Sequence, residues 1–116
     1  TDVLLTDKRR PLLVHFWASW CPICELEHGS IQSISEDHAV ITVAMQSGEA
    51  QEVIAYMRQE KLKFPVINDP DGVLARRFGV RAVPSSFVIN EENNIEFSET
   101  GFTTETGLRL RLWLAK

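Results

Sequence analysis

The chain has 116 residues, of which 44% are hydrophobic and 24% are charged, a composition typical of one soluble globular domain. The formal net charge of −4 gives no indication of a nucleic-acid-binding or membrane-surface protein. No apolar run reaches the roughly 18 residues that a transmembrane helix needs, and two cysteines are too few for a disulfide-stapled scaffold. We therefore expect a single domain over residues 1–116.

The first part of the chain predicts a β-α-β unit. Residues 3–5 are expected to form a short edge strand, and the nearly continuous apolar run Leu12–Trp17 is typical of a strand covered on both faces. A helix is expected over residues 22–36, with a bend at Gly29, before a second buried strand at Ala39–Met45. The apolar positions expected on neighbouring turns of the helix, with one serine between them, are Leu26, Ser30, Ile31 and Ile34. Strand, helix and strand at this spacing predict a parallel pair.

A second helix is expected over residues 50–61, followed by a small strand at 64–67. Its predicted apolar face follows the spacing i, i+3, i+4, i+7 and consists of Ala50, Val53, Ile54 and Met57. Residues 68–72 predict a turn whose aspartates can cap a third helix, which buries Leu74 and Phe78 and ends at a left-handed Gly79.

The last third predicts a β-hairpin and a helix. The hairpin joins a strand at 87–90 to a strand at Ile95–Thr100 through a loop at 91–94. The leucines after residue 107 alternate as in a strand, but the composition and a capping Thr103 or Thr104 favour a helix. Helices on both faces of a mixed sheet make this an α/β fold.

The only two cysteines, Cys21 and Cys24, lie where the first strand gives way to the first helix. A helix start offers unpaired N–H groups and the positive end of the helix dipole, which favour a thiolate, the reactive form of cysteine. The second sulfur, one turn later, can displace whatever the first has attacked. We expect Cys21 to be the more exposed, attacking thiolate and Cys24 to be the buried, resolving thiol.

Two other interpretations of the cysteines stay open. The pair could be half of a structural metal site, or two inert core thiols. A metal site needs further ligands, and only His28 is well spaced from Cys24, since His15 lies in a strand and His38 in a loop. We predict no metal ligands and expect His28 and His38 to be surface residues. Trp17 and Trp20 are expected to serve packing and the rim of the site.

Residues 16–24 resemble the active-site segment of the thioredoxin superfamily, and the likeness covers nearly the whole chain. It implies a thioredoxin-like three-layer sandwich, in which helices flank a central mixed sheet. Residues 47–69 resemble the helix and strand inserted in the branch of TlpA, ResA and the cytochrome-c-biogenesis proteins. Within that branch, the segment from His15 to Cys24 is most similar to the group of suppressor-of-copper-sensitivity protein D.

The resemblance assigns roles to further residues. The branch carries a glutamate at the position of Glu27, which could relay protons or restrain Cys24; the alternative is a solvated helix charge. The superfamily implies a cis bond before Pro84, facing the disulfide, with the backbone of Val83 pairing with an extended substrate; the alternative is an ordinary trans turn.

Three positions depart from the pattern of the superfamily. His15 stands where ordinary thioredoxins place a buried aspartate, so it lies either under the active site or in the core as a satisfied histidine. The dipeptide between the cysteines is Pro22-Ile23, and Gly29 replaces a common proline. Trp20, Pro22 and Ile23 are expected to support the site.

The predicted function is that of an enzyme, a thiol–disulfide oxidoreductase that acts on protein disulfides and needs no cofactor. The resemblance implies a periplasmic reductase, monomeric, tethered to the bacterial inner membrane by an N-terminal anchor outside these residues and recharged by a DsbD-like transmembrane electron donor. The alternatives are a disulfide oxidase or isomerase and, from another class, a Cys/His metal-binding module. The sequence leaves open the reduction potential, the substrates and any connection to copper or haem.

Overall fold

The computed structural model describes residues 8–116, which form a mixed five-stranded sheet of order β3-β2-β1-β4-β5. The strands are β1 (Leu12–Trp17), β2 (Ala39–Met45), β3 (Val66–Asp69), β4 (Ser85–Ile89) and β5 (Ile95–Thr100). β1, β2 and β3 run parallel, whereas β4 is antiparallel to both β1 and β5. The predicted parallel pair and hairpin are confirmed; the strand expected at 3–5 lies outside the described residues.

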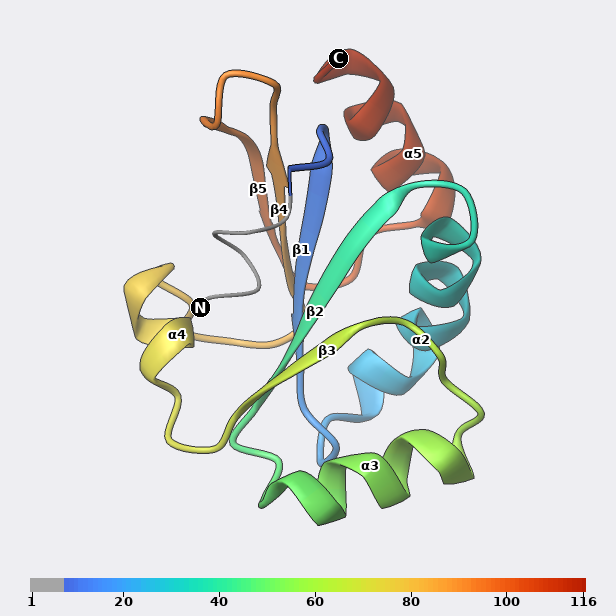
Figure 1. The fold of residues 1–116 in the computed structure, drawn as a ribbon, viewed down its shortest axis with the longest axis vertical. Helices are drawn as coiled ribbons and strands as arrows, with labels where there is room; N and C mark the ends of the chain where they lie inside the picture. The colour runs from blue at the N-terminus through green and yellow to red at the C-terminus, as the bar shows by residue number, and fades with distance from the viewer. Residues whose placement is uncertain (1–7) are drawn as a thin grey trace.

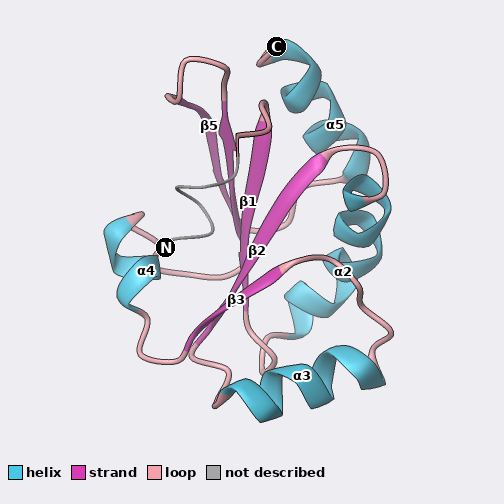
Figure 2. Cartoon of the chain, viewed as in Figure 1, coloured by secondary structure: helices cyan, strands magenta, loops and turns pink. Residues whose placement is uncertain are grey.

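Helices cover both faces of this sheet (Figure 1). They are α2 (Pro22–Ser35), α3 (Ala50–Gln59), α4 (Val73–Arg77) and α5 (Glu105–Leu114). Figure 2 shows α4 on one side of the sheet and α2, α3 and α5 on the other. The thioredoxin-like sandwich predicted from the sequence is therefore confirmed.

The side chains of β1 supply both buried layers, because successive residues of a strand point to opposite faces. Leu13 and Trp17 pack in the cluster that contains residues of α2, α3 and α5. Leu12, Val14 and Phe16 pack in the cluster on the α4 side. Position 15 therefore faces α2, which matters for the site.

The predicted apolar faces of α2 and α3 are partly wrong. Leu26 is 75% exposed, and α2 instead turns Cys24, Glu27, His28, Ile31 and Ile34 inward. In α3 only Val53 and Met57 are buried, whereas Ala50 and Ile54 are exposed. Each helix is rotated about its own axis, by part of a turn, relative to the orientation that the predicted apolar face implied.

β3 begins two residues later than predicted, and Pro65 supplies the physical reason. A proline has no N–H to donate to a sheet ladder. The carbonyl of Pro65 still accepts a hydrogen bond from the Thr42 N–H at 2.9 Å, and Phe64 before it is buried in the core. The regular strand therefore starts at Val66.

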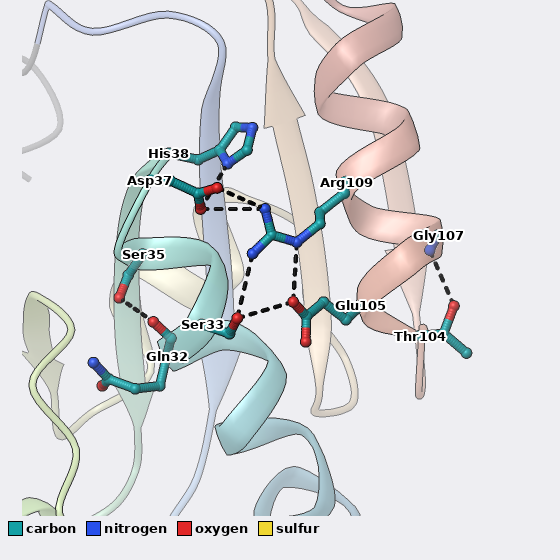
Figure 3. Close-up of polar contacts among 9 residues, drawn as sticks. All are labelled: Gln32, Ser33, Ser35, Asp37, His38, Thr104, Glu105, Gly107 and Arg109. Atoms are coloured by element: carbon teal, nitrogen blue, oxygen red, sulfur yellow. Dashed lines mark hydrogen bonds and ion pairs between the residues drawn. The ribbon is translucent and has the colours of Figure 1, made fainter.

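A polar network fastens α5 to the C-terminal end of α2 (Figure 3). The Arg109 guanidinium contacts Asp37 and Glu105 at 2.9 Å each, and Ser33 donates to the same Glu105 carboxylate at 2.9 Å. Hydrogen bonds from Arg109 hold the pKa of both carboxyl groups below their ordinary range. The network fixes the position of the chain just before α5, which reaches the site.

The short helix α4 depends on Asp69, one of the aspartates predicted to cap it. The Asp69 carboxylate accepts the Leu74 N–H at 3.2 Å and the Ala75 N–H at 3.0 Å. Gly79 follows the helix with a φ of 72°, as predicted for a left-handed residue.

Replacing Asp69 with alanine should therefore lower the free energy of unfolding by about 2 kcal/mol, because two buried N–H groups lose their acceptor. Urea denaturation followed by circular dichroism measures the loss. Asp71→Ala, at an exposed position of the same turn, is the matched control and should change stability little. Equal effects of the two substitutions would contradict this role of Asp69.

Candidate functional site

The two cysteines lie at the strand-to-helix junction, as predicted. Cys21 is the N-cap residue of α2, and Pro22 occupies the first turn, where its missing N–H costs nothing. The Cys21 sulfur accepts a hydrogen bond from the Cys24 N–H at 3.2 Å. Both are free thiols in the structure.

The environments of the two thiols differ. Cys21 retains 6% of its surface and Cys24 none, so Cys21 is the one that a partner can reach. Burial raises the pKa of Cys24, and its contact with Cys21 and the charges of Cys21 and Glu27 raise it further. Cys24 therefore needs a proton acceptor before it can act as a nucleophile.

The Val83-Pro84 step lies beside Cys21. The Val83 carbonyl oxygen is 3.7 Å from the Cys21 sulfur, and the peptide bond between Val83 and Pro84 is cis. Pro84 is buried and Val83 half-buried. The structure thus brings together the cysteines and the residues expected to meet the substrate.

The two tryptophans occupy the positions expected of them. Trp17 is buried in the core, whereas Trp20 is 58% exposed at the rim and donates its indole N–H to the Gln46 carbonyl at 2.9 Å. Pro22 and Ile23 are exposed beside it. The surface around Cys21 is therefore largely apolar.

Glu27 is not a solvated helix charge, because it is completely buried. Its Oε2 accepts the Thr103 N–H at 2.8 Å, from the segment that leads into α5. Burial raises the pKa of Glu27, and the hydrogen bond from Thr103 partly opposes that shift. A carboxyl group with a raised pKa is a better proton acceptor than an ordinary one, which suits Glu27 to acid–base chemistry.

His15 is a core residue that lies next to Glu27. It is fully buried; its Nε2 is 3.5 Å from Glu27 Oε1, and its Nδ1 is 2.8 Å from the Ser86 hydroxyl. Burial, and secondarily the charge of His28, lower the pKa of His15 to about 3. The ring is therefore neutral at physiological pH and carries a single N–H.

The prediction that His28 is a surface residue is wrong, because α2 turns it inward. It is buried against Trp17, with ring centroids 5.1 Å apart, and its Nε2 is 3.0 Å from the Tyr56 hydroxyl. Burial lowers its pKa to about 4. His38 is half-buried, and its Nδ1 lies 3.2 Å from the Asp37 carboxylate. Within residues 8–116, no group of three or more His, Cys, Asp or Glu side chains could hold a metal ion.

Sequence reasoning missed Ser86 and Thr103. Ser86 faces His15 across the β1–β4 pair, a register that a local pattern does not reveal. Thr103 contributes only its backbone N–H to Glu27, so its side chain leaves no signal. Tyr56, the partner of His28, was also missed, although it lies near the buried face of a predicted helix.

The geometry can be compared with known proteins. The Redoxin family matches residues 1–109. The chain is 32% identical to a thioredoxin-like protein of Haemophilus influenzae, covering 95% of this chain and 66% of that protein. It is 30% identical to sporulation thiol-disulfide oxidoreductase A of Bacillus subtilis, covering 93% of this chain and 70% of that protein. The chain belongs to the Redoxin family.

A solved structure supports the same assignment. The crystal structure of StoA from Bacillus subtilis superimposes with a TM-score of 0.78 at 31% identity, covering 95% of this chain and 86% of that one. The relatives include proteins named as a thiol-disulfide oxidoreductase and as thiol:disulfide interchange proteins, so the predicted superfamily and enzyme class are confirmed. The chain spans about two thirds of the length of the two curated relatives. The likeness to the suppressor-of-copper-sensitivity group stays a prediction.

Proposed function

We propose that the domain reduces disulfide bonds of other proteins through Cys21 and Cys24. The arrangement that supports this most is a helix-capping Cys21 that keeps 6% of its surface exposed, with a fully buried Cys24 one turn later whose pKa is raised by burial, by Cys21 and by the charge of the buried Glu27. An inert pair of core thiols would not need a carboxylate nearby, whose burial is energetically costly.

The reaction has two exchanges. The Cys21 thiolate attacks one sulfur of the substrate disulfide, forms a mixed disulfide and releases the first substrate thiolate. Cys24 then gives its proton to Glu27 and attacks the Cys21 sulfur, which closes the Cys21–Cys24 disulfide and releases the second thiolate. The substrate gains two electrons, the cysteine pair loses two, and no cofactor takes part.

The substrate is expected to lie as an extended strand against Val83 and Pro84. The polar backbone of Val83 is next to the Cys21 sulfur, and the exposed Trp20 and Ile23 offer apolar contact area beside it. Main-chain pairing of this kind gives affinity without demanding one sequence, which suits a domain that acts on several proteins.

The cellular setting belongs to the same proposal. A periplasmic location, an N-terminal membrane anchor, a DsbD-like electron donor and a monomeric state follow from the resemblance to the TlpA-like branch, and matches to proteins named DsbE agree with an extracytoplasmic role. Among the helices of residues 8–116, none is long and apolar enough to cross a membrane.

The direction of electron flow is tested by the equilibrium reduction potential of the pair in a glutathione or dithiothreitol buffer. A reductase should lie near thioredoxin, at about −270 mV, whereas a strong oxidase such as DsbA lies at about −120 mV. Tryptophan fluorescence or alkylation can follow the equilibrium, with the Cys21→Ser, Cys24→Ser double variant as a blank. A value near the oxidase end would overturn the reductase and favour an oxidase or isomerase.

Replacing Cys24 with serine should trap mixed disulfides through Cys21, because the resolving thiol is lost. Non-reducing electrophoresis and mass spectrometry with a disulfide-containing protein such as oxidised insulin measure the trapped species. Cys21→Ser is the matched control and should trap little. Trapping by Cys21→Ser alone would reverse the two roles. If neither variant traps a mixed disulfide and the parent protein does not reduce insulin, the proposed activity is wrong.

Glu27→Gln should slow the second exchange by about a hundredfold near neutral pH, since the amide cannot accept the proton of Cys24. Reaction of the reduced protein with dithiobis(nitrobenzoate) separates the steps, because Cys21 releases the first thionitrobenzoate and Cys24 the second. Glu25→Gln, on the exposed face of the same helix, is the control. An unchanged second phase in Glu27→Gln would remove Glu27 from the mechanism.

A further inference from the structure

Two buried polar atoms beneath the cysteines face each other without any hydrogen-bond partner in the described part of the chain. They are His15 Nε2 and Glu27 Oε1, 3.5 Å apart on side chains with no exposed surface. Such atoms destabilise a fold unless they interact with each other, because burial removes their hydration. The 3.5 Å contact between them is the one polar interaction that the described part of the chain offers to both atoms.

Ser86 determines which nitrogen of His15 carries the proton. Its hydroxyl lies 2.8 Å from His15 Nδ1, and this is the hydrogen bond that the structure gives to that buried hydroxyl. If the hydroxyl donates, Nδ1 is bare and the ring proton is on Nε2, the nitrogen that lies 3.5 Å from Glu27 Oε1. If Nδ1 donated instead, the hydroxyl proton would lose its acceptor. The first tautomer satisfies more of the buried groups.

With that tautomer, each oxygen of the Glu27 carboxylate faces an N–H group. Oε2 accepts the Thr103 N–H at 2.8 Å, and Oε1 faces His15 Nε2–H. Donors on both oxygens favour the ionised form of a carboxyl group that burial would otherwise keep protonated.

We propose that His15 is a positioning residue which, with its tautomer fixed by Ser86, holds buried Glu27 ionised and ready to accept the proton of Cys24. This inference rests on the proposed role of Glu27 in the second exchange. His15 itself takes no proton, because burial lowers its pKa to about 3.

The other titratable groups packed around the pair keep their protonation near neutral pH. From α2, burial lowers the pKa of His28 to about 4; from α3, burial and then the charges of Glu60 and Glu25 raise that of Tyr56 to about 12. Cys21 and Cys24, which change during the reaction, complete the set. A change of the second exchange with pH therefore reports on Glu27 and the thiols.

The test measures both phases of thionitrobenzoate release against pH for His15→Leu, which keeps the site apolar but removes the N–H. The midpoint of the second phase should move to higher pH by about one unit, because Glu27 loses a donor to its ionised form. The first phase should stay unchanged. Loss of the first phase in the parent protein would instead sink the proposed function itself.

Two variants separate positioning from simple packing. The side chain of His15→Gln is long enough to offer an amide N–H to Glu27 and should restore most of the parent profile. That of His15→Asn reaches only Ser86, so this variant should resemble His15→Leu. In a Glu27→Gln background, His15→Leu should produce no further change in the second phase. The same shift in the Glu27→Gln background would overturn the proposal. So would the absence of a shift, or a shift to lower pH, when His15→Leu is made alone.

The tautomer gives a readout that needs no substitution at position 15. Nitrogen-15 NMR of the reduced protein should show His15 protonated at Nε2 and bare at Nδ1, and Ser86→Ala should move the second-phase midpoint in the same direction as His15→Leu. If His15→Leu does not fold, the NMR spectrum of His15 and the pH profile of Ser86→Ala test the proposal in its place. A proton on Nδ1 would overturn the proposal.

Discussion

The buried carboxylate of Glu27 is the constraint on which the site depends. An ionisable group without exposed surface is costly unless donors meet it, and the nearest backbone donor, Thr103, belongs to a segment 76 residues further along the chain. That segment must be held against α2 for the contact to exist. The Arg109 network, which joins Asp37 of the loop after α2 to Glu105 of α5, holds it there (Figure 3).

The same constraint explains why α2 presents polar side chains to the core. The residues Cys24, Glu27, His28 and Ile31 follow the spacing i, i+3, i+4, i+7, so they share one helix face. This face cannot bury Glu27 and Leu26 together, because neighbouring residues point about 100° apart. Leu26 is the residue left exposed, and the apolar contact it would have made is replaced by the packing of His28 on Trp17 and Tyr56.

Much of the fold and of the candidate site could be predicted from local sequence patterns. The predictions that were wrong or incomplete have one physical origin. The apolar run of β1, the helix after it and the two cysteines at their junction are short-range features that composition and spacing reveal. Composition and spacing do not reveal the rotation of α2 about its axis or the partners of its buried groups. Both depend on contacts between residues far apart in the sequence. Leu26 looked like core and His28 like surface because hydrophobicity alone ignores a polar group whose partner, Tyr56, is 28 residues away. The contact of Ser86 with His15 can be recognised only from the register of the sheet, and that of Thr103 with Glu27 only from the position of the segment before α5.

Position 15 decides how much negative charge lies beneath Cys24. An aspartate there, as in ordinary thioredoxins, would add a second carboxylate to the buried region that holds Glu27, and two buried like charges raise one another's pKa until one is protonated. A neutral histidine gives the same space an N–H in place of a charge, so position 15 adds no second carboxylate beside Glu27. Proton transfer from Cys24 to Glu27 then exchanges a thiol and a carboxylate for a thiolate and a neutral acid, without ever leaving two negative charges side by side. The substitution of His15 for an acid and the presence of Glu27 are therefore two parts of one solution to the problem of activating a buried thiol.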